Sequence, residues 1–304
     1  MKNHSIYKQK ISYICTPTNL QAHGRHLHPY SLLQDTLHLL RFLLHHPQRT
    51  EKPLYPCVVQ GVADAERISE GRASRNDLLR WQPPSQLAEE DFHEVFETIR
   101  KYYGMEHCRE ITLEANPDDL TEAYAAMLQN LPFNRISMGI QTFDDSTLKL
   151  LNRRHNAAQA VNAVKHCRHA GFNNISIDLI YGLPGETDER WKRDLQQAVS
   201  LNVEHISAYH LTYEEGTRIY ELLQAHRIRE VDEESSVRFF STLIDTLGSA
   251  GYEHYEISNF CRSDMYSRHN TSYWKGIPYL GCGPSAHSFN TDTREWNVAS
   301  LEKY

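Results

Sequence analysis

From residue 87 onward, strand-like apolar runs alternate with segments that have helical spacing of apolar residues. This alternation limits the possible folds more than any other feature of the sequence. Short apolar runs bounded by turn residues predict five strands: Glu110–Glu114, Arg135–Gln141, Ile175–Tyr181, His205–Leu211 and Tyr255–Ser258. Longer segments with apolar residues at helical spacing predict the helices: Leu87–Tyr103, Leu120–Leu131, Asp144–Leu151, Ala157–Ala170, Asp188–Leu201 and Glu233–Ala250. Strands that are apolar on both faces and separated by helices are typical of a parallel sheet. The sequence therefore predicts an α/β fold, and the number of units favours an open or partial (β/α) barrel.

The segment 1–82 lacks this alternation and also differs in composition. It carries more basic than acidic side chains, whereas 83–304 carries more acidic than basic ones. Apart from one leucine-rich run, it shows no sustained helical or strand period. We therefore expect two parts, an extension with little specified structure at 1–82 and an α/β domain at 83–304.

The overall composition argues against several classes of protein. The formal net charge of -7 argues against non-specific binding to nucleic acid as the main function, because such binding depends on an excess of basic side chains. The longest apolar stretch, Leu37–Leu44, is interrupted by His38 and Arg41 and is far shorter than the roughly 18 residues that span a bilayer. The sequence shows no charged start followed by an apolar run, which is the pattern typical of a signal peptide. We expect a cytoplasmic protein with no transmembrane segment, and peripheral contact with a membrane stays open.

Polar residues follow the predicted strands at the ends where parallel α/β folds bind their ligands. They are Glu114, Gln141, Asp178 and the segment His210-Leu211-Thr212-Tyr213. The carboxylates accept hydrogen bonds from an amino group or from ribose hydroxyls, and the Gln141 amide both donates and accepts. Arg153 follows the next helix and is suited to pair with a ligand carboxylate. The alternative is that each residue caps a neighbouring helix or meets a loop amide, but four converging strand ends favour a ligand site.

His269 lies in a segment, HNTSYW, that places an imidazole beside two aromatic side chains. Such a segment either lines the site of a flat aromatic ligand or forms a packed, hydrogen-bonded loop. The six cysteines show none of the spacings typical of zinc or iron–sulfur sites, so reduced and mostly buried thiols are the favoured interpretation.

Taken together and in order, several segments resemble the radical S-adenosylmethionine (SAM) family: ITLEANPDDL, RISMGIQTFDD, LNRRH, DLIYGLPGET, SAYHLTYE, YEISNF, HNTSYW and GCGPSAHSF. Within that family they are similar to the HemW-like heme chaperones, which are often described as oxygen-independent coproporphyrinogen III oxidase-like. The resemblance covers Pro84–Tyr304 and implies a partial (β/α) barrel of the radical SAM type. It also implies that five residues contact SAM: Glu114, Gln141, Arg153, Asp178 and Thr212.

The chain departs from the family pattern at both ends. The family holds a [4Fe-4S] cluster with the thiolates of a C-x-x-x-C-x-x-C motif, which this chain as written lacks, so we expect no metal ligands in it. Shifting the reading frame by one base allows Cys at three junctions: Leu33-Gln34, Leu37-His38 and Leu40-Arg41. We therefore hypothesise that 1–82 is out-of-frame text. The family also continues into a small C-terminal domain, which we expect to be missing here.

The resemblance implies two functions, and whether the protein is an enzyme stays open between them. In the family, the cluster binds SAM, and one-electron reduction can cleave SAM to a 5′-deoxyadenosyl radical. The first hypothesis is a heme chaperone that binds heme, with His269 as a candidate contact, and passes it to heme-accepting proteins. As written, it would be inactive in cluster chemistry. The second is oxygen-independent oxidation of coproporphyrinogen III in porphyrin biosynthesis. The shifted frame allows only Phe or Ser where those oxidases carry a fourth Cys, which favours the chaperone. A barrel that binds nothing is the third interpretation.

Overall fold

The computed structural model describes residues 17–18, 75–76, 78–81, 87–282 and 286–298. The chain divides into two compact units. The first unit holds Ala115–Gln129 and Asn134–Ser267, and the second holds Asn130–Phe133 and the described parts of Lys10–Glu114 and Arg268–Tyr304. Most of the segment 1–82 lies outside the described residues, so the hypothesis of a shifted reading frame stays a prediction.

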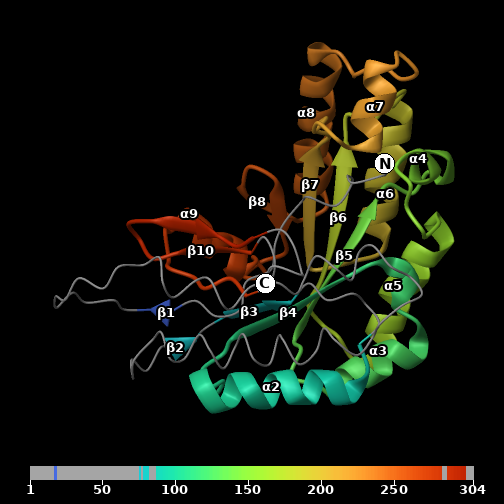
Figure 1. The fold of residues 1–304 in the computed structure, drawn as a ribbon. Coiled ribbons are helices and arrows are strands. Elements are labelled where there is room, and N and C mark those ends of the chain that lie inside the picture. Colours follow the sequence, from blue (N-terminus) through green and yellow to red (C-terminus); the bar gives the residue numbers. More distant parts are fainter. Residues whose placement is uncertain (1–16, 19–74, 77, 82–86, 283–285, 299–304) are drawn as a thin grey trace. The chain divides into compact units, whose positions relative to one another are not determined.

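The first unit is built on a mixed sheet with the strand order β5-β6-β7-β9-β8 (Figure 1). β5 (Arg135–Gln141), β6 (Ile175–Tyr181) and β7 (His205–His210) are parallel. β9 (Asn259–Cys261) runs antiparallel to β7, and β8 (Glu253–Glu256) runs antiparallel to β9. The predicted succession of parallel strands is thus confirmed for β5, β6 and β7, while the last part of the sheet is antiparallel.

Helices follow the strands as the alternation predicts. After the short 3-10 helix η3 (Pro117–Asp119), the helices of this unit are α3 (Glu122–Gln129), α4 (Asp145–Leu150), α5 (Ala157–Ala170), α6 (Asp188–Ser200), α7 (Arg218–Gln224) and α8 (Glu233–Ser249). Their boundaries follow local chemistry. The Asn156 side chain caps α5 by accepting from Gln159 N, and Gly171 ends it in a left-handed conformation.

Two sequence predictions in this unit need correction. The strand expected at Tyr255–Ser258 is instead the hairpin of β8 and β9, with Ile257 exposed in the turn between them. The sequence prediction also missed α7, whose seven residues are too few to show a clear helical period.

The two faces of the sheet differ in chemistry. Along one face, Met138, Ile177, Ile206 and Phe260 stand in register on four neighbouring strands, and none has any exposed surface. Tyr181 lies on the same face, and its ring contacts Trp191 of α6 and Phe240 of α8. The helices therefore cover this apolar face, which supplies the core of the unit.

The second unit contains α2 (Glu89–Tyr103) and a parallel pair, β3 (Leu78–Trp81) with β4 (Glu110–Ala115). Phe92 and Phe96 of α2 pack edge to face against Phe133, with ring centroids 5.3 and 5.1 Å away. The remaining elements are α9 (Arg268–Trp274), the antiparallel pair β10 (His287–Phe289) and β11 (Arg294–Trp296), and a two-residue pairing of β1 (Pro17–Thr18) with β2 (Arg75–Asn76).

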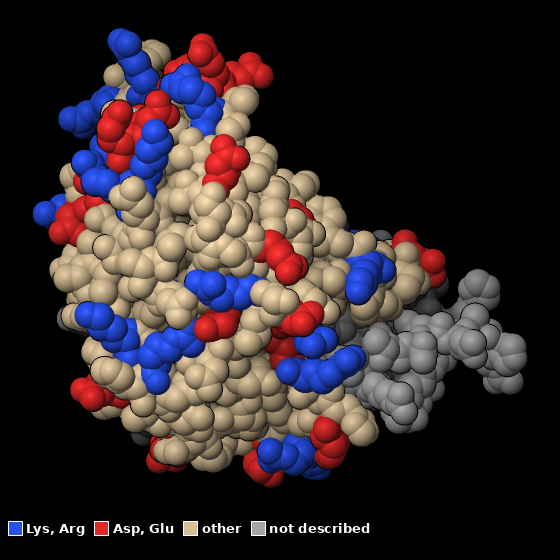
Figure 2. Space-filling model, turned by 180° about the vertical axis from the view of Figure 1, so that it is seen from behind, with Lys and Arg blue, Asp and Glu red and all other residues tan. Residues whose placement is uncertain are grey.

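Charged side chains of both signs are interspersed on the face seen in Figure 2. The face therefore offers no large patch of a single sign for a polyanion. Among the described residues, no helix combines the length and apolarity that crossing a membrane requires.

Candidate functional site at the ends of β5 and β6

The face of the sheet opposite the helices carries polar side chains in two successive rows. Ser137, Ser176 and His205 form one row, and the Ser176 hydroxyl lies 2.8 Å from His205 Nδ1. The next row contains Gly139, Asp178, Ser207 and Asn259, and the Ser207 hydroxyl donates to Asn259 Oδ1 at 2.6 Å. Since a polar group rarely lies in a sheet interior without partners or a ligand, this face is the natural place for a site.

Gln141 ends β5 in an unusual conformation. Its φ of 71° lies in the left-handed region, which is costly for a residue other than glycine. The register of β5 against β6 also shifts there, because Gly139 pairs with Asp178 while Gln141 pairs with Leu179. Such a bulge redirects the side chain that follows it. A β-carbon added to Gly139 would lie 2.9 Å from Gln141 Nε2, so the Gln141 amide lies over Gly139.

Arg153 reaches the same point from the turn between α4 and α5. Its Nη2 donates to the Gly139 carbonyl at 2.8 Å and to Asn116 Oδ1 at 2.9 Å. It also lies 3.2 Å from the position of a β-carbon on Gly139. The absence of a side chain at 139 therefore makes room for both the Gln141 amide and the Arg153 guanidinium, beside the strand position of Asp178.

The structure thus brings together three of the residues predicted from the sequence, Gln141, Arg153 and Asp178. Thr212 lies just beyond the end of β7 with an exposed side chain. Glu114 is half-buried near the end of β4 and belongs to the second unit. The first three residues can bind a zwitterion: a guanidinium for a carboxylate, a carboxylate for an amine, and an amide for either.

His269 also belongs to the second unit, at the start of α9. The backbone N–H groups of Arg268 and His269 donate to the buried Glu110 carboxylate, at 2.9 and 3.1 Å. The imidazole Nε2 lies 2.9 Å from the Tyr273 hydroxyl, and the two rings meet edge to face. The segment is thus a packed, hydrogen-bonded helix. This is close to the packed, hydrogen-bonded loop that was the second interpretation of its sequence.

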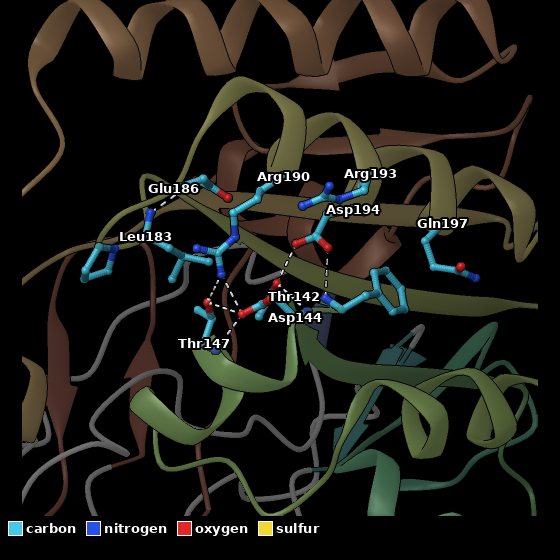
Figure 3. Close-up of a pocket in the computed structure, with 11 residues that line it drawn as sticks. Thr142, Asp144, Thr147, Leu183, Glu186, Arg190, Arg193, Asp194 and Gln197 are labelled. Atoms are coloured by element: carbon cyan, nitrogen blue, oxygen red, sulfur yellow. Dashed lines mark hydrogen bonds and ion pairs between the residues drawn. The ribbon is translucent and has the colours of Figure 1, made fainter.

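A cavity of about 200 Å³ lies beside the loops that follow β5 and β6 (Figure 3). Three charged residues that line it did not stand out in the sequence: Glu186, Arg190 and Asp194. Arg190 pairs with Asp144 at 2.6 Å and donates to the Thr147 hydroxyl at 2.8 Å. Asp194 is buried among apolar neighbours on α6, and a carboxylate within that apolar stripe is the signal that could have identified it.

Burial raises the pKa of two carboxyl groups in this cavity. The pKa of Glu186 rises to about 7, although its carboxylate accepts from the N–H groups of Leu183 and Gly182. The pKa of Asp194 is also raised, because burial outweighs the hydrogen bonds that it accepts. The polar groups of the cavity mostly satisfy one another, so they brace the loops that follow β5 and β6.

The described cysteines do not fit an iron–sulfur cluster. No group of three or more His, Cys, Asp or Glu side chains among the described residues could hold a metal ion. Burial raises the thiol pKa of Cys167 and Cys282 to about 12 and that of Cys261 to about 11, which favours neutral thiols over the thiolates that a cluster needs. Cys15 and Cys57 lie outside the described residues.

Comparisons with known proteins bear on the family and the fold of the chain. Residues 83–198 match the radical SAM superfamily. The chain is 34% identical over 222 residues to the heme chaperone HemW of Bacillus subtilis, which covers 73% of this chain and 59% of that protein. It is 33% identical over 250 residues to HemW of Haemophilus influenzae, covering 80% of this chain and 64% of the relative. The chain thus spans about three fifths of the length of the HemW proteins that it matches.

Among solved structures, the coproporphyrinogen III oxidase HemN from Escherichia coli, described as a radical SAM enzyme, matches with a TM-score of 0.65. The match covers 90% of this chain and 69% of that one at 21% sequence identity. At that identity the likeness shows the fold alone, and it confirms the predicted partial (β/α) barrel.

Proposed function

Because the chain belongs to the radical SAM superfamily and is HemW-like in sequence, we propose that it binds SAM at the ends of β5 and β6 and acts in heme transfer. The observation that carries the first part is the meeting of the Gln141 amide and the Arg153 guanidinium over Gly139. Asp178 stands in register with Gly139 on the next strand.

SAM has groups that match these side chains. Arg153 would hold its carboxylate, and Asp178 would accept from its amino group or from a ribose hydroxyl. Gln141 would donate or accept between them. The resemblance to the family adds Glu114 and Thr212 to the proposed SAM contacts: Thr212 follows β7 in the same unit as Gln141, and Glu114 lies near the end of β4 in the second unit. In the family, cleavage of bound SAM takes one electron from the [4Fe-4S] cluster, so the role that we propose for these residues is to bind and orient SAM.

We derive no step through a [4Fe-4S] cluster, because the described cysteines do not fit one. The proposal that the chain as written lacks the cluster has a direct test. Anaerobic reconstitution with iron and sulfide should leave less than one iron per chain. An iron content of about four per chain, with the matching sulfide, would overturn it.

SAM binding is tested by equilibrium dialysis of labelled SAM against the full chain. Removing the guanidinium by Arg153→Ala should weaken binding by about tenfold or more, the value of a hydrogen bond to a charged group. The matched control is Arg154→Ala, because the adjacent guanidinium pairs with Asp118 and Asp119 instead. Equal losses in the two variants, or no saturable binding by the wild type, would contradict the proposed site.

The chaperone function rests on the HemW-like sequence. We propose that the chain binds heme and passes it to heme-accepting proteins, with His269 as the candidate contact. Heme coordination by its Nε2 would require the ring to leave the Tyr273 hydroxyl. Titration with heme should produce a saturable absorption change that His269→Ala alters, and transfer to an apo-heme protein should follow. Oxidation of coproporphyrinogen III by the same preparation would instead support the alternative, an oxidase.

A further inference from the structure

We propose that Asp194 is a positioning residue: it holds the backbone after Gln141 so that the Gln141 amide points over Gly139. The inference rests on the proposed function in one respect, that the Gln141 amide contacts SAM. Asp194 itself lies in α6 and lines the cavity beside the loops, outside the set of residues proposed to touch SAM.

Asp194 makes two hydrogen bonds to the residues that directly follow Gln141 (Figure 3). The Thr142 hydroxyl donates to its Oδ2 at 2.5 Å, and the Phe143 N–H donates to its Oδ1 at 3.1 Å. Asp194 is 6% exposed and Thr142 is 2% exposed, so water competes little for these bonds. A carboxylate paired in this way fixes both the hydroxyl and the backbone of the segment.

The backbone at Gln141 needs such an anchor. The Thr142 N–H donates to the Ile140 carbonyl at 3.0 Å, which closes a three-residue turn with Gln141 at its centre. Turns of this kind with a positive φ at the centre are rare and strained. A left-handed non-glycine residue persists only where its surroundings hold it there. The carboxylate of Asp194, some fifty residues further along the chain, is the partner that holds the next two residues.

The consequence is the direction of the Gln141 side chain. With φ at 71°, the amide Nε2 comes to lie over Gly139, close to the Arg153 guanidinium. If Gln141 relaxed to an ordinary strand conformation, the side chain would leave that position, since the orientation of a strand residue depends on its backbone. Asp194 therefore acts on the ligand site through Gln141, without contacting the ligand.

The first arm of the test is a double-mutant cycle on SAM affinity. Asp194→Ala should weaken SAM binding by about the same factor as Gln141→Ala, on the order of tenfold. The double variant should lose no more than either single variant. Asp194→Asn should restore most of the affinity, because its amide can still accept from Phe143 N–H and donate to Thr142 Oγ1. Additive losses would overturn the proposal.

A matched control separates positioning from general loss of stability. Glu204 also accepts from a backbone N–H, that of Ile175 at 2.9 Å, and pairs with Arg168. It lies at the opposite end of the sheet, before β7. Glu204→Ala should lower the free energy of unfolding without changing SAM affinity. A loss of affinity in this variant as large as that of Asp194→Ala would reduce the role of Asp194 to general stability and overturn the proposal.

The second arm needs no ligand. Glycine adopts a positive φ without strain, so Gln141→Gly should raise the midpoint of urea unfolding in the wild-type background. In the Asp194→Ala background the same substitution should lower the midpoint, because Gln141 has then already relaxed. The same shift in both backgrounds would overturn the proposal. Coupling in this arm together with no SAM binding by the wild type would instead leave the positioning intact and reject the proposed function.

Discussion

A methyl group added at Gly139 should disrupt ligand binding while leaving the fold intact. The β-carbon of Gly139→Ala would lie 2.9 Å from Gln141 Nε2 and 3.2 Å from Arg153 Nη2. Both distances are shorter than an ordinary carbon–nitrogen contact, so both groups must move. Each is the far end of a flexible side chain, and the movement therefore costs the fold little. It shifts the Gln141 amide, and by a few tenths of an ångström the Arg153 guanidinium, away from the position in which we propose that they bind SAM.

The size of the effect follows from the groups displaced. Two hydrogen bonds to charged ligand groups would be weakened, at about 1–1.5 kcal/mol each. Together they predict a rise in the dissociation constant for SAM of roughly 30- to 150-fold. The free energy of unfolding should change by less than about 1 kcal/mol, because the lower chain entropy of unfolded alanine offsets part of the crowding.

Equilibrium dialysis and urea unfolding on the same preparations measure these two quantities. The control is Gly248→Ala in α8, since a β-carbon there meets no atom within 4 Å. It should leave SAM affinity unchanged. If Gly139→Ala bound SAM as tightly as the wild type while remaining folded, the ligand would not lie over Gly139, and the proposed site would be wrong.

Three further predictions concern stability. Because burial raises the pKa of Glu186 to about 7, the folded state favours the protonated carboxyl group. The resulting contribution to the free energy of unfolding is complete below the ordinary pKa of about 4.5 and is lost as the pH rises through 7. In urea unfolding, Glu186→Gln should therefore remove a pH dependence on the order of 2–3 kcal/mol between pH 5 and 8. Gly182→Ala should destabilise by about 2 kcal/mol or more, because φ is 74° and the β-carbon would lie 2.6 Å from His210 Nε2. Trp191→Phe should lower the melting temperature and cost about 1–3 kcal/mol, because the Phe239 carbonyl loses its 2.9 Å indole hydrogen bond; no change would mean that water replaces the donor.

The sequence was sufficient to predict the elements that have strong local signals. β5 and β6 were placed to the residue, because Ile-rich runs bounded by turns can form little else in an α/β fold. The boundaries of α5 were equally clear, since Asn156 is a local start signal and Gly171 is a local stop signal. The end of the sheet was harder to predict, because the segment from Glu253 to Cys261 folds back as a hairpin with few apolar residues.

Of the site, residue types at strand ends could be predicted, but their directions could not. Asp178 and Gln141 both follow from position on a parallel sheet. The left-handed backbone at Gln141 has no local signal, since neither neighbour is glycine and the residue that anchors it is Asp194, in another helix. Side-chain direction here depends on a contact distant in sequence, which pattern reasoning along one strand cannot supply.

The two faces of the sheet separate stability from binding, and this separation makes the predictions independent. Ile177 and its neighbours in register have no exposed surface and pack under the helices. Shortening one of these side chains should lower the free energy of unfolding by roughly 0.5 kcal/mol or more, as truncations in a core do, and should have a smaller effect on SAM affinity. Asp178 alternates with them on the polar face, where its replacement by Asn should change ligand affinity and leave the core unaltered. Asp194 contributes to both stability and binding, because it lies within the apolar face of α6 and also holds the turn that orients the Gln141 side chain. A substitution of Asp194 should therefore change both the free energy of unfolding and the affinity for SAM. A substitution on the apolar face of the sheet should change mainly the first quantity, and one on the polar face mainly the second.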